Sequence, residues 1–223
     1  NDPSGTTSTA EYNVALGTAA LDAITTGDKN TAIGYNALTT FTEGTGNTVV
    51  GYDAGVNITT GQYNALFGID AGGDITTGLY NVCVGGGAGS RITTSHYNSF
   101  VGYGAGTLVT NGYCVALGFN AMYGGTGGSA CVAIGSRAGY SSAAGGDHNC
   151  LVGYQTGYYI STGDDNTMLG NLNGIASGPG TALTTGHRNV LIGAWLDCSA
   201  ADVTDEIVIG SGGSYAAGLV GKG

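Results

Sequence analysis

Residues 47–106 read NTVVGYDAGVNITTGQY, NALFGIDAGGDITTGLY and NVCVGGGAGSRITTSHY, and then NSFVGYGAG from Asn98. The Asn that opens each copy recurs at an interval of 17 residues. In each complete copy an apolar triplet leads to a Gly, and a polar turn and an Ile-Thr-Thr segment follow. A fixed period of this length is typical of proteins in which each repeat packs on its neighbours. The sequence therefore predicts a stacked repeat architecture.

The same motif recurs along nearly the whole chain. Copies open at Asn13, Asn30, Asn47, Asn64, Asn81, Asn98, Cys114, Cys131, Asn149, Asn166, Asn189 and Glu206. All twelve copies contain the Gly, which we interpret as structural: Gly17, Gly34, Gly51, Gly68, Gly85, Gly102, Gly118, Gly135, Gly153, Gly170, Gly193 and Gly210. An interval of 23 residues after Asn166 contains SGPGTA, which predicts an inserted loop at residues 177–182. We expect a lead-in over residues 1–12, one repeat shaft over 13–213 and a C-terminal extension over 214–223.

The triplet before each Gly predicts a short β-strand, because its residues are mostly β-branched or apolar and a turn residue follows. Helix is excluded, since a Gly every few residues would cost about 1 kcal/mol each and no apolar period of 3.6 residues is present. Seventeen residues can hold two or three short strands joined by tight turns. The predicted fold is all-β, a parallel β-solenoid or β-roll of about twelve 17-residue coils.

Two apolar columns run through these triplets. The residue directly before the Gly, such as Leu16 or Phe67, is large and apolar in every copy, and we expect it to fill the coil. The residue before that one is apolar as well, and alternation along a strand places it on the opposite side. An outward apolar stripe needs a partner to cover it, so this column predicts a seam between copies of the chain. The seam candidates are Ala15, Ala32, Val49, Leu66, Cys83, Phe100, Ala116, Ala133, Leu151, Met168, Leu191 and Val208.

Composition excludes several classes of function. The formal net charge is −10 with only five Lys and Arg, whereas nucleic-acid binding needs clustered basic residues. No apolar run reaches the length of about 20 residues that membrane insertion requires. Cys114 and Cys131 share one register in adjacent copies, so a disulfide is compatible with stacked strands about 4.8 Å apart. Two small buried thiols are the alternative that we favour. No cofactor and no metal site are predicted.

The segments NTAIGYNAL at residues 30–38, CVAIGSRAG at 131–139 and TDEIVIGSG at 204–212 carry a family resemblance. They are similar to the head repeats of trimeric autotransporter adhesins, and they resemble the Gly-rich repeats of bacteriophage tail fibres still more closely. The resemblance extends from Asn13 to about Gly213. It implies a parallel homotrimer that serves as an extracellular stalk or a receptor-binding rod.

Tyrosine is the residue type best suited to bind a ligand. The candidate glycan contacts stand directly before the motif in four consecutive copies: Tyr63, Tyr80, Tyr97 and Tyr113. Exposed aromatic rings can stack on sugar rings, and a cell-surface glycan is the ligand that this pattern suggests. Stacking of the rings on one another, which stiffens the rod or fills a seam, is the alternative that we favour.

Polar residues give weaker signals. Asp53 and Asp70 share one register and could hold a cation between coils, although solvated turn acids are the favoured interpretation. His96, His148 and His187 lie in turns on different copies, without an evident acid and nucleophile beside them. We therefore expect that the chain is not an enzyme.

The sequence thus predicts a structural protein of the virion surface or the extracellular space, the homotrimeric shaft of a tail fibre that contributes to host attachment. A cell-surface adhesin or an extracellular filament subunit is the close alternative. An ice-binding solenoid is a third, because Thr pairs such as Thr59-Thr60 and Thr76-Thr77 recur in a regular array.

Overall fold

The computed structural model describes residues 9–124, 128–141, 146–174, 183–211 and 219–222. The chain forms two compact units, Asn1–Gly112 (unit 1) and Tyr113–Gly223 (unit 2). Both units are all-β parallel solenoids, and together they contain about eleven coils. The boundary falls where the interval between motifs, from Asn98 to Cys114, is 16 residues instead of 17. The inserted loop predicted at residues 177–182 lies outside the described residues.

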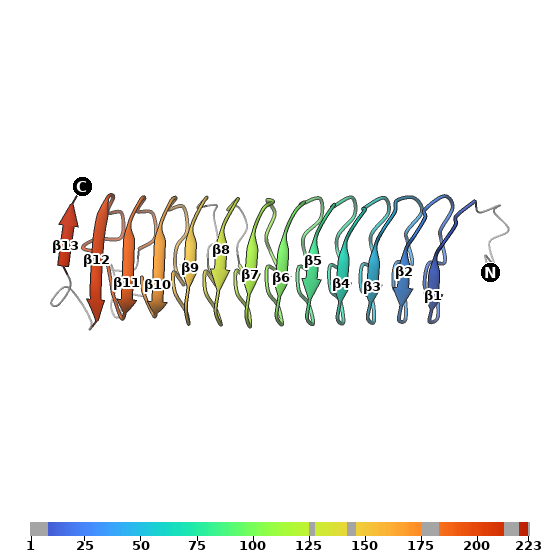
Figure 1. Ribbon diagram of the computed structural model, residues 1–223, viewed down its shortest axis with the longest axis horizontal. Helices are drawn as coiled ribbons and strands as arrows, with labels where there is room; N and C mark the ends of the chain where they lie inside the picture. Colours follow the sequence, from blue (N-terminus) through green and yellow to red (C-terminus); the bar gives the residue numbers. More distant parts are fainter. Residues whose placement is uncertain (1–8, 125–127, 142–145, 175–182, 212–218, 223) are drawn as a thin grey trace. The chain divides into compact units, whose positions relative to one another are not determined.

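The predicted triplets form the strands (Figure 1). Unit 1 contains β1 (Val14–Leu16), β2 (Thr31–Ile33), β3 (Thr48–Val50), β4 (Ala65–Phe67), β5 (Val82–Val84) and β6 (Ser99–Val101). Unit 2 contains β7 (Val115–Leu117), β8 (Val132–Ile134), β9 (Cys150–Val152), β10 (Thr167–Asn171), β11 (Val190–Ala194), β12 (Glu206–Ser211) and β13 (Leu219–Lys222). Within each unit successive strands up to β12 pair in parallel, and equivalent triplet residues face one another, as Ala32 faces Val49. The parallel β-solenoid prediction is confirmed.

The C-terminal extension adds one strand. In β13, Leu219 pairs with Ile209 and Lys222 pairs with Glu206, so this strand is antiparallel to β12. The last parallel strand of unit 2 therefore has its free edge covered by a strand of opposite direction. Covering an edge in this way satisfies backbone groups that would otherwise be open to pairing with another chain.

The Gly that ends each triplet has a conformational reason. All twelve adopt φ between +129° and +156°, a region that residues with a Cβ rarely occupy. The coils also approach closely there. A Cβ built on Gly85 would lie 2.6 Å from the carbonyl oxygen of Gly102 in the next coil. The structural role predicted for this Gly column is confirmed at the level of backbone geometry.

A ladder of buried Asn side chains fixes which way each strand faces. The Asn64 side-chain amide donates to Oδ1 of Asn47 at 3.1 Å and to the Gly78 carbonyl at 2.9 Å. Its own Oδ1 accepts hydrogen bonds from the backbone and side-chain N–H groups of Asn81. The same pattern links Asn149, Asn166 and Asn189 in unit 2. Because the Asn points inward, the second residue of the triplet also points inward by alternation.

This orientation corrects the predicted seam. The second triplet residue is buried inside the coil, with no exposed surface at Ala32, Val49 or Leu66, and the column is buried in every coil except at Ala15 in the first strand. The column from Ala15 to Val208 is therefore core, and it cannot cover another chain. The residue before the Gly, which was expected inside, faces outward: Leu16 is 66 % exposed and Phe67 is 40 % exposed.

The second triplet residue, here called the inner residue, varies in size from Ala to Phe. The coil accommodates this variation because the size of a second side chain in the same coil changes in the opposite sense. Six residues after the inner residue, the chain carries Leu38 where the inner residue is Ala32, and Gly72 where it is Leu66. A Cβ on Gly72 would lie 3.0 Å from the Leu66 side chain, so the large inner residue occupies that space. The pairs Val49–Gly55, Cys83–Gly89, Phe100–Gly106, Ala116–Met122, Leu151–Gly157 and Met168–Gly174 follow the same rule.

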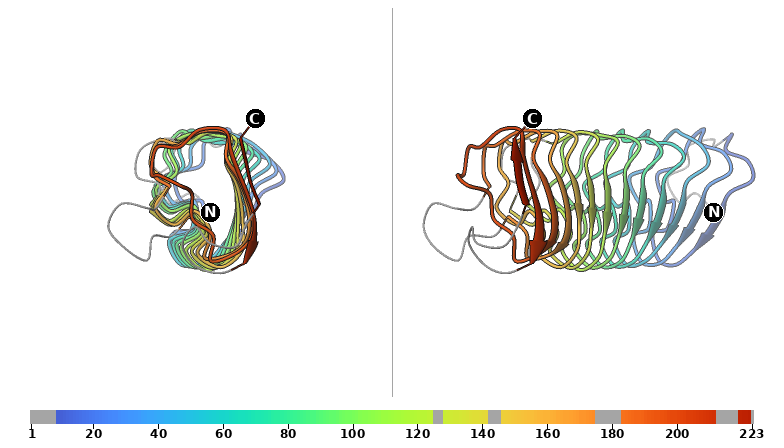
Figure 2. Two further views of the ribbon diagram at one scale, coloured as in Figure 1. Left: turned by 90° about the vertical axis from the view of Figure 1, so that its left-hand side faces the viewer. Right: turned by 60° about the vertical axis from the view of Figure 1, so that its left-hand side comes forward.

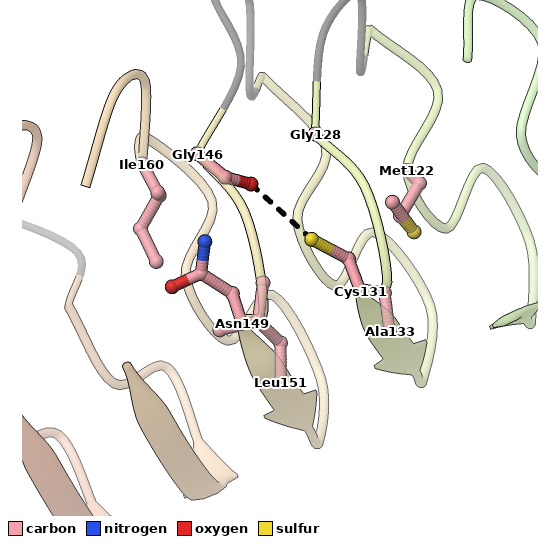
Figure 3. A pocket seen from close by; sticks show the side chains of 8 residues that line it. All are labelled: Met122, Gly128, Cys131, Ala133, Gly146, Asn149, Leu151 and Ile160. Atoms are coloured by element: carbon pink, nitrogen blue, oxygen red, sulfur yellow. Dashed lines mark hydrogen bonds between the residues drawn. The ribbon is translucent and has the colours of Figure 1, made fainter. Parts of the chain in front are cut away.

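The coil of Ala133 breaks this compensation on the small side. Ala133 and Gly139 are both small, and a pocket opens there in unit 2, lined by Met122, Cys131, Ala133, Leu151 and others (Figure 3). The pocket is about the size of one water molecule. Its polar groups are already engaged, since the Cys131 thiol donates to the Gly146 carbonyl at 3.2 Å. We interpret the pocket as a packing defect.

Candidate self-association interface

The successive strands of each unit form one sheet along the side of the solenoid (Figure 2), and their outward residues make up one sheet face. In unit 1 this sheet face consists of Val14, Leu16, Thr31, Ile33, Thr48, Val50, Ala65, Phe67, Val82, Val84, Ser99 and Val101. In unit 2 it consists of Val115, Leu117, Val132, Ile134, Cys150, Val152, Thr167, Leu169, Val190, Ile192, Ile207 and Ile209. Short parallel strands in register place these side chains in straight rows about 4.8 Å apart.

The sheet face is apolar and carries no charge. None of its residues is Asp, Glu, Lys, Arg or His. Many of the large apolar side chains are more than a third exposed, including Phe67, Leu117, Ile192 and Ile209. Contiguous apolar surface of this kind is rare on the exterior of a soluble monomer and marks a place of interaction. The exposed apolar columns are therefore the opposite ones from those that the sequence analysis named as seam candidates.

Tyrosines flank the sheet face of unit 1 on the side where the strands begin. The rings of Tyr63 and Tyr80 stack with centroids 4.9 Å apart, and those of Tyr80 and Tyr97 stack at 5.1 Å. All three residues have positive φ, a strained conformation for a residue with a Cβ that the ring stacking helps to offset. Because Tyr80 is covered on both faces, this row presents ring edges and hydroxyls, which suits the favoured stacking interpretation better than stacking on a sugar.

The row on the other side of the face mixes large side chains with small or polar ones such as Gly86 and Ser136. Its large members are all exposed: Tyr35, Tyr52, Ile69 and Tyr103 in unit 1, and Phe119 and Tyr154 in unit 2. In unit 2 the row before the strands changes character. Tyr113 is followed along it by ionic groups, with Arg188 and Asp205 joined at 2.7 Å and His148 lying 3.4 Å from Asp165. Polar and aromatic borders around an apolar centre are the usual anatomy of a protein interface.

The cysteines divide between core and face. Cys114 and Cys131 are buried free thiols, as the favoured interpretation expected, and they replace Asn in the inner ladder. The Cys114 thiol donates to the Gly128 carbonyl at 3.3 Å, as an Asn amide does in other coils. Cys150 is the one cysteine that is not buried, and it lies on the sheet face.

The acids and histidines singled out in the sequence make local contacts. Asn36 donates to Asp53 at 3.0 Å. Burial raises the pKa of Asp70, and the charges of Asp74 and Asp53 raise it further. Nδ1 of His96 accepts the backbone N–H of Leu79 at 2.9 Å. Among the described residues no cluster of three or more His, Cys, Asp or Glu has the arrangement of a metal site.

One buried carboxyl group makes stability depend on pH. Asp197 is 8 % exposed, and no described residue donates a hydrogen bond to its Oδ1. Burial raises its pKa from 3.8 to about 6. A raised carboxyl pKa stabilises the folded state at low pH, and that contribution is lost as the pH rises through about 6.

We expect Asp197→Asn to be more stable than the wild type at pH 8 by about 2 kcal/mol, because the variant no longer buries a charge. Near pH 4 the two proteins should differ little. Thermal unfolding at both pH values measures the effect, with the exposed Asp202→Asn as the matched control. An equal gain at pH 4 and pH 8 would contradict the assignment.

Comparison with protein-family models, with characterised proteins and with solved structures found no significant match. In the described part of the chain, no helix has the length and hydrophobicity that a membrane crossing needs.

Proposed function

We propose that the protein is a structural, non-enzymatic shaft subunit of a tail fibre on the virion surface, assembled as a homotrimer and contributing to host-surface attachment. The observation that carries the proposal is the charge-free apolar sheet face of both units. The trimeric state and the fibre setting come from the resemblance to tail-fibre repeats. The repeated Gly and Asn columns stabilise the stacking of the coils, which is consistent with a mechanical role for the protein.

The sheet face of each unit supplies a large part of the area that a stable association needs. Six strands at about 4.8 Å and flanking rows that widen the face to about 20 Å give roughly 500 Å² per unit. Stable protein interfaces bury about 800 Å² per partner. A second copy of this chain is the partner that fits best, since its sheet face is apolar and has the same coil spacing, so that rows can interdigitate along their whole length.

Two alternatives have less support. A cell-surface adhesin or an extracellular filament subunit would use the same sheet face, and what the rod is attached to separates it from a tail fibre. An ice-binding surface needs hydroxyls that are available to water. The Thr59 and Thr76 hydroxyls instead donate to carbonyl groups of the next coil, Thr76 O and Thr93 O, at 3.3 Å each.

Sedimentation equilibrium tests the proposal directly. We expect a species of three times the chain mass, in which the thiol of Cys150 is protected from a maleimide reagent. A monomer at micromolar concentration with a freely reactive Cys150 would overturn the proposed assembly. Electron microscopy of the native particle then distinguishes a virion fibre from a cell-surface rod.

A further inference from the structure

Arg137 occupies an unusual position in unit 2. It lies just after Gly135 with φ of +58°, and its backbone N–H donates to the Phe119 carbonyl at 2.8 Å. Its guanidinium carbon lies 5.9 Å from the ring centroid of Phe119 and 5.9 Å from that of Tyr140. Both distances are within the range of a cation–π contact. Two rings therefore hold the guanidinium group in place.

The charge of Arg137 is not neutralised by a carboxylate in the described part of the chain. Arg188, in contrast, is neutralised by a carboxylate, because its guanidinium donates two hydrogen bonds to Asp205 at 2.7 and 2.9 Å. Aromatic rings attract the charge of Arg137 but accept few of its five N–H groups, so its planar fork can still bind a carboxylate.

An aromatic surface continues from this arginine over three coils. Tyr140 stacks on Tyr123 at 5.4 Å and on Tyr158 at 4.9 Å, and Tyr159 packs edge-on against Tyr158 at 4.7 Å. Tyr123 is 36 % exposed and Tyr159 is 46 % exposed. No equivalent row exists in unit 1, where the corresponding positions hold Asp22, Thr39, Val56, Gly73, Ser90 and Thr107.

We propose that Phe119, Tyr123, Arg137, Tyr140, Tyr158 and Tyr159, here called the aromatic platform, bind an acidic saccharide whose carboxylate pairs with Arg137. The ligand class is a glycan that contains uronic acid or a similar carboxylated sugar. The fork of Arg137 matches a carboxylate with two parallel hydrogen bonds. The exposed ring of Tyr159 and the ring edges of the stacked tyrosines contact the C–H groups of a pyranose, and the phenol groups exchange hydrogen bonds with its hydroxyls.

The arrangement favours this ligand over a simple anion. A small anion would use Arg137 alone and leave the row of tyrosines without a role. The platform spans three coils at about 4.8 Å, so it is longer than one sugar ring and suits a short oligosaccharide. In a protein of net charge −10, a polyanion is repelled over much of the surface, which favours binding at a site that supplies a cation.

This inference goes beyond the proposed assembly and does not depend on it. The platform is formed by residues of one chain, so a monomer would bind as well as a trimer. The sequence suggested Tyr63, Tyr80, Tyr97 and Tyr113 for glycan binding, and the cation–π contacts of Arg137 are instead to Phe119 and Tyr140.

Isothermal titration calorimetry with a short oligogalacturonate tests the proposal, with a neutral galactose oligomer of equal length as the comparison ligand. We expect the wild type to bind the acidic oligomer only, and Arg137→Gln to weaken binding about tenfold to a hundredfold, as expected for loss of a charged hydrogen-bonded pair. Arg188→Gln removes the same charge outside the platform and should bind as the wild type does.

Several results would overturn the inference. These are unchanged binding by Arg137→Gln, equal binding of the neutral oligomer, or full displacement by acetate at the same carboxylate concentration. If Arg137→Gln fails to fold, Tyr159→Ala takes its place, because Tyr159 is exposed and its loss should weaken binding several-fold. Sedimentation of both variants should be unchanged, so failure of this inference is distinguishable from failure of the proposed assembly.

Discussion

Replacing Gly68 by Val should destabilise unit 1 by at least about 4 kcal/mol, enough to prevent its folding or to lower its melting temperature by tens of degrees. Gly68 has φ of +139°, which a β-branched residue cannot adopt without severe strain. A Cβ there would lie 2.6 Å from the carbonyl oxygen of Gly85 and 2.7 Å from its carbonyl carbon. Both obstacles are backbone atoms of the next coil, so no side chain can move aside.

Thermal unfolding followed by circular dichroism measures this effect, and Thr77→Ser is the matched control. Thr77 lies in the same coil as Gly68, and it is exposed. Serine keeps its hydroxyl, so a change within about 0.5 kcal/mol is expected. Equal melting temperatures for the two variants would mean that the Gly column does not set the spacing of the coils.

The strand positions followed from the sequence because each depends on local signals. An apolar triplet such as Val82–Val84, closed by a Gly at a fixed interval, permits little besides a short strand and a turn. The regular interval of the Asn places its side chains in one column, which is where the ladder forms. The 17-residue period does not predict the division of the chain at Gly112, because that division depends on which residues contact one another in the folded chain.

The direction in which the triplets face was predicted wrongly for a physical reason. Size suggested that Leu16 and Phe67 belong to the core, and that Ala32 could lie outside. The inward direction is fixed instead by the buried Asn one residue before the strand, whose amide must find partners inside the coil. Once Asn64 points inward, Leu66 must do so too, and Gly72 makes the room for it.

The sequence contains a regular spacing of tyrosines in the aromatic platform that was not used in the prediction. Tyr123, Tyr140 and Tyr158 each stand five residues after the repeat Gly, in three consecutive coils. The tyrosines predicted as ligand contacts were those directly before the motif, such as Tyr63. The lack of a carboxylate partner for Arg137 among the described residues could not be read from the sequence, because it depends on which acids the fold brings near.

Introducing a charge on the sheet face, by Phe67→Glu, should weaken self-association at least about 100-fold while leaving the single chain folded. Phe67 lies outward on β4, between Val50 and Val84, and it is 40 % exposed in the single chain. A carboxylate there remains in water in the monomer, so its cost to folding should stay near 1 kcal/mol. In the assembly each copy would bury an unpaired charge in an apolar seam, which costs several kcal/mol.

Sedimentation equilibrium of Phe67→Glu over a range of concentrations measures this loss. Thr77→Glu adds the same charge to unit 1 at an exposed position off the sheet face, so it separates a local effect from a change in net charge. Lowering the pH below about 4 should restore part of the association of Phe67→Glu, since a neutral carboxylic acid is cheaper to bury. If Phe67→Glu associates as strongly as the wild type, the interface lies elsewhere, because burying a charge at the centre of an apolar seam must weaken association. If Thr77→Glu dissociates to the same extent as Phe67→Glu, the effect comes from net charge and the interface again lies elsewhere.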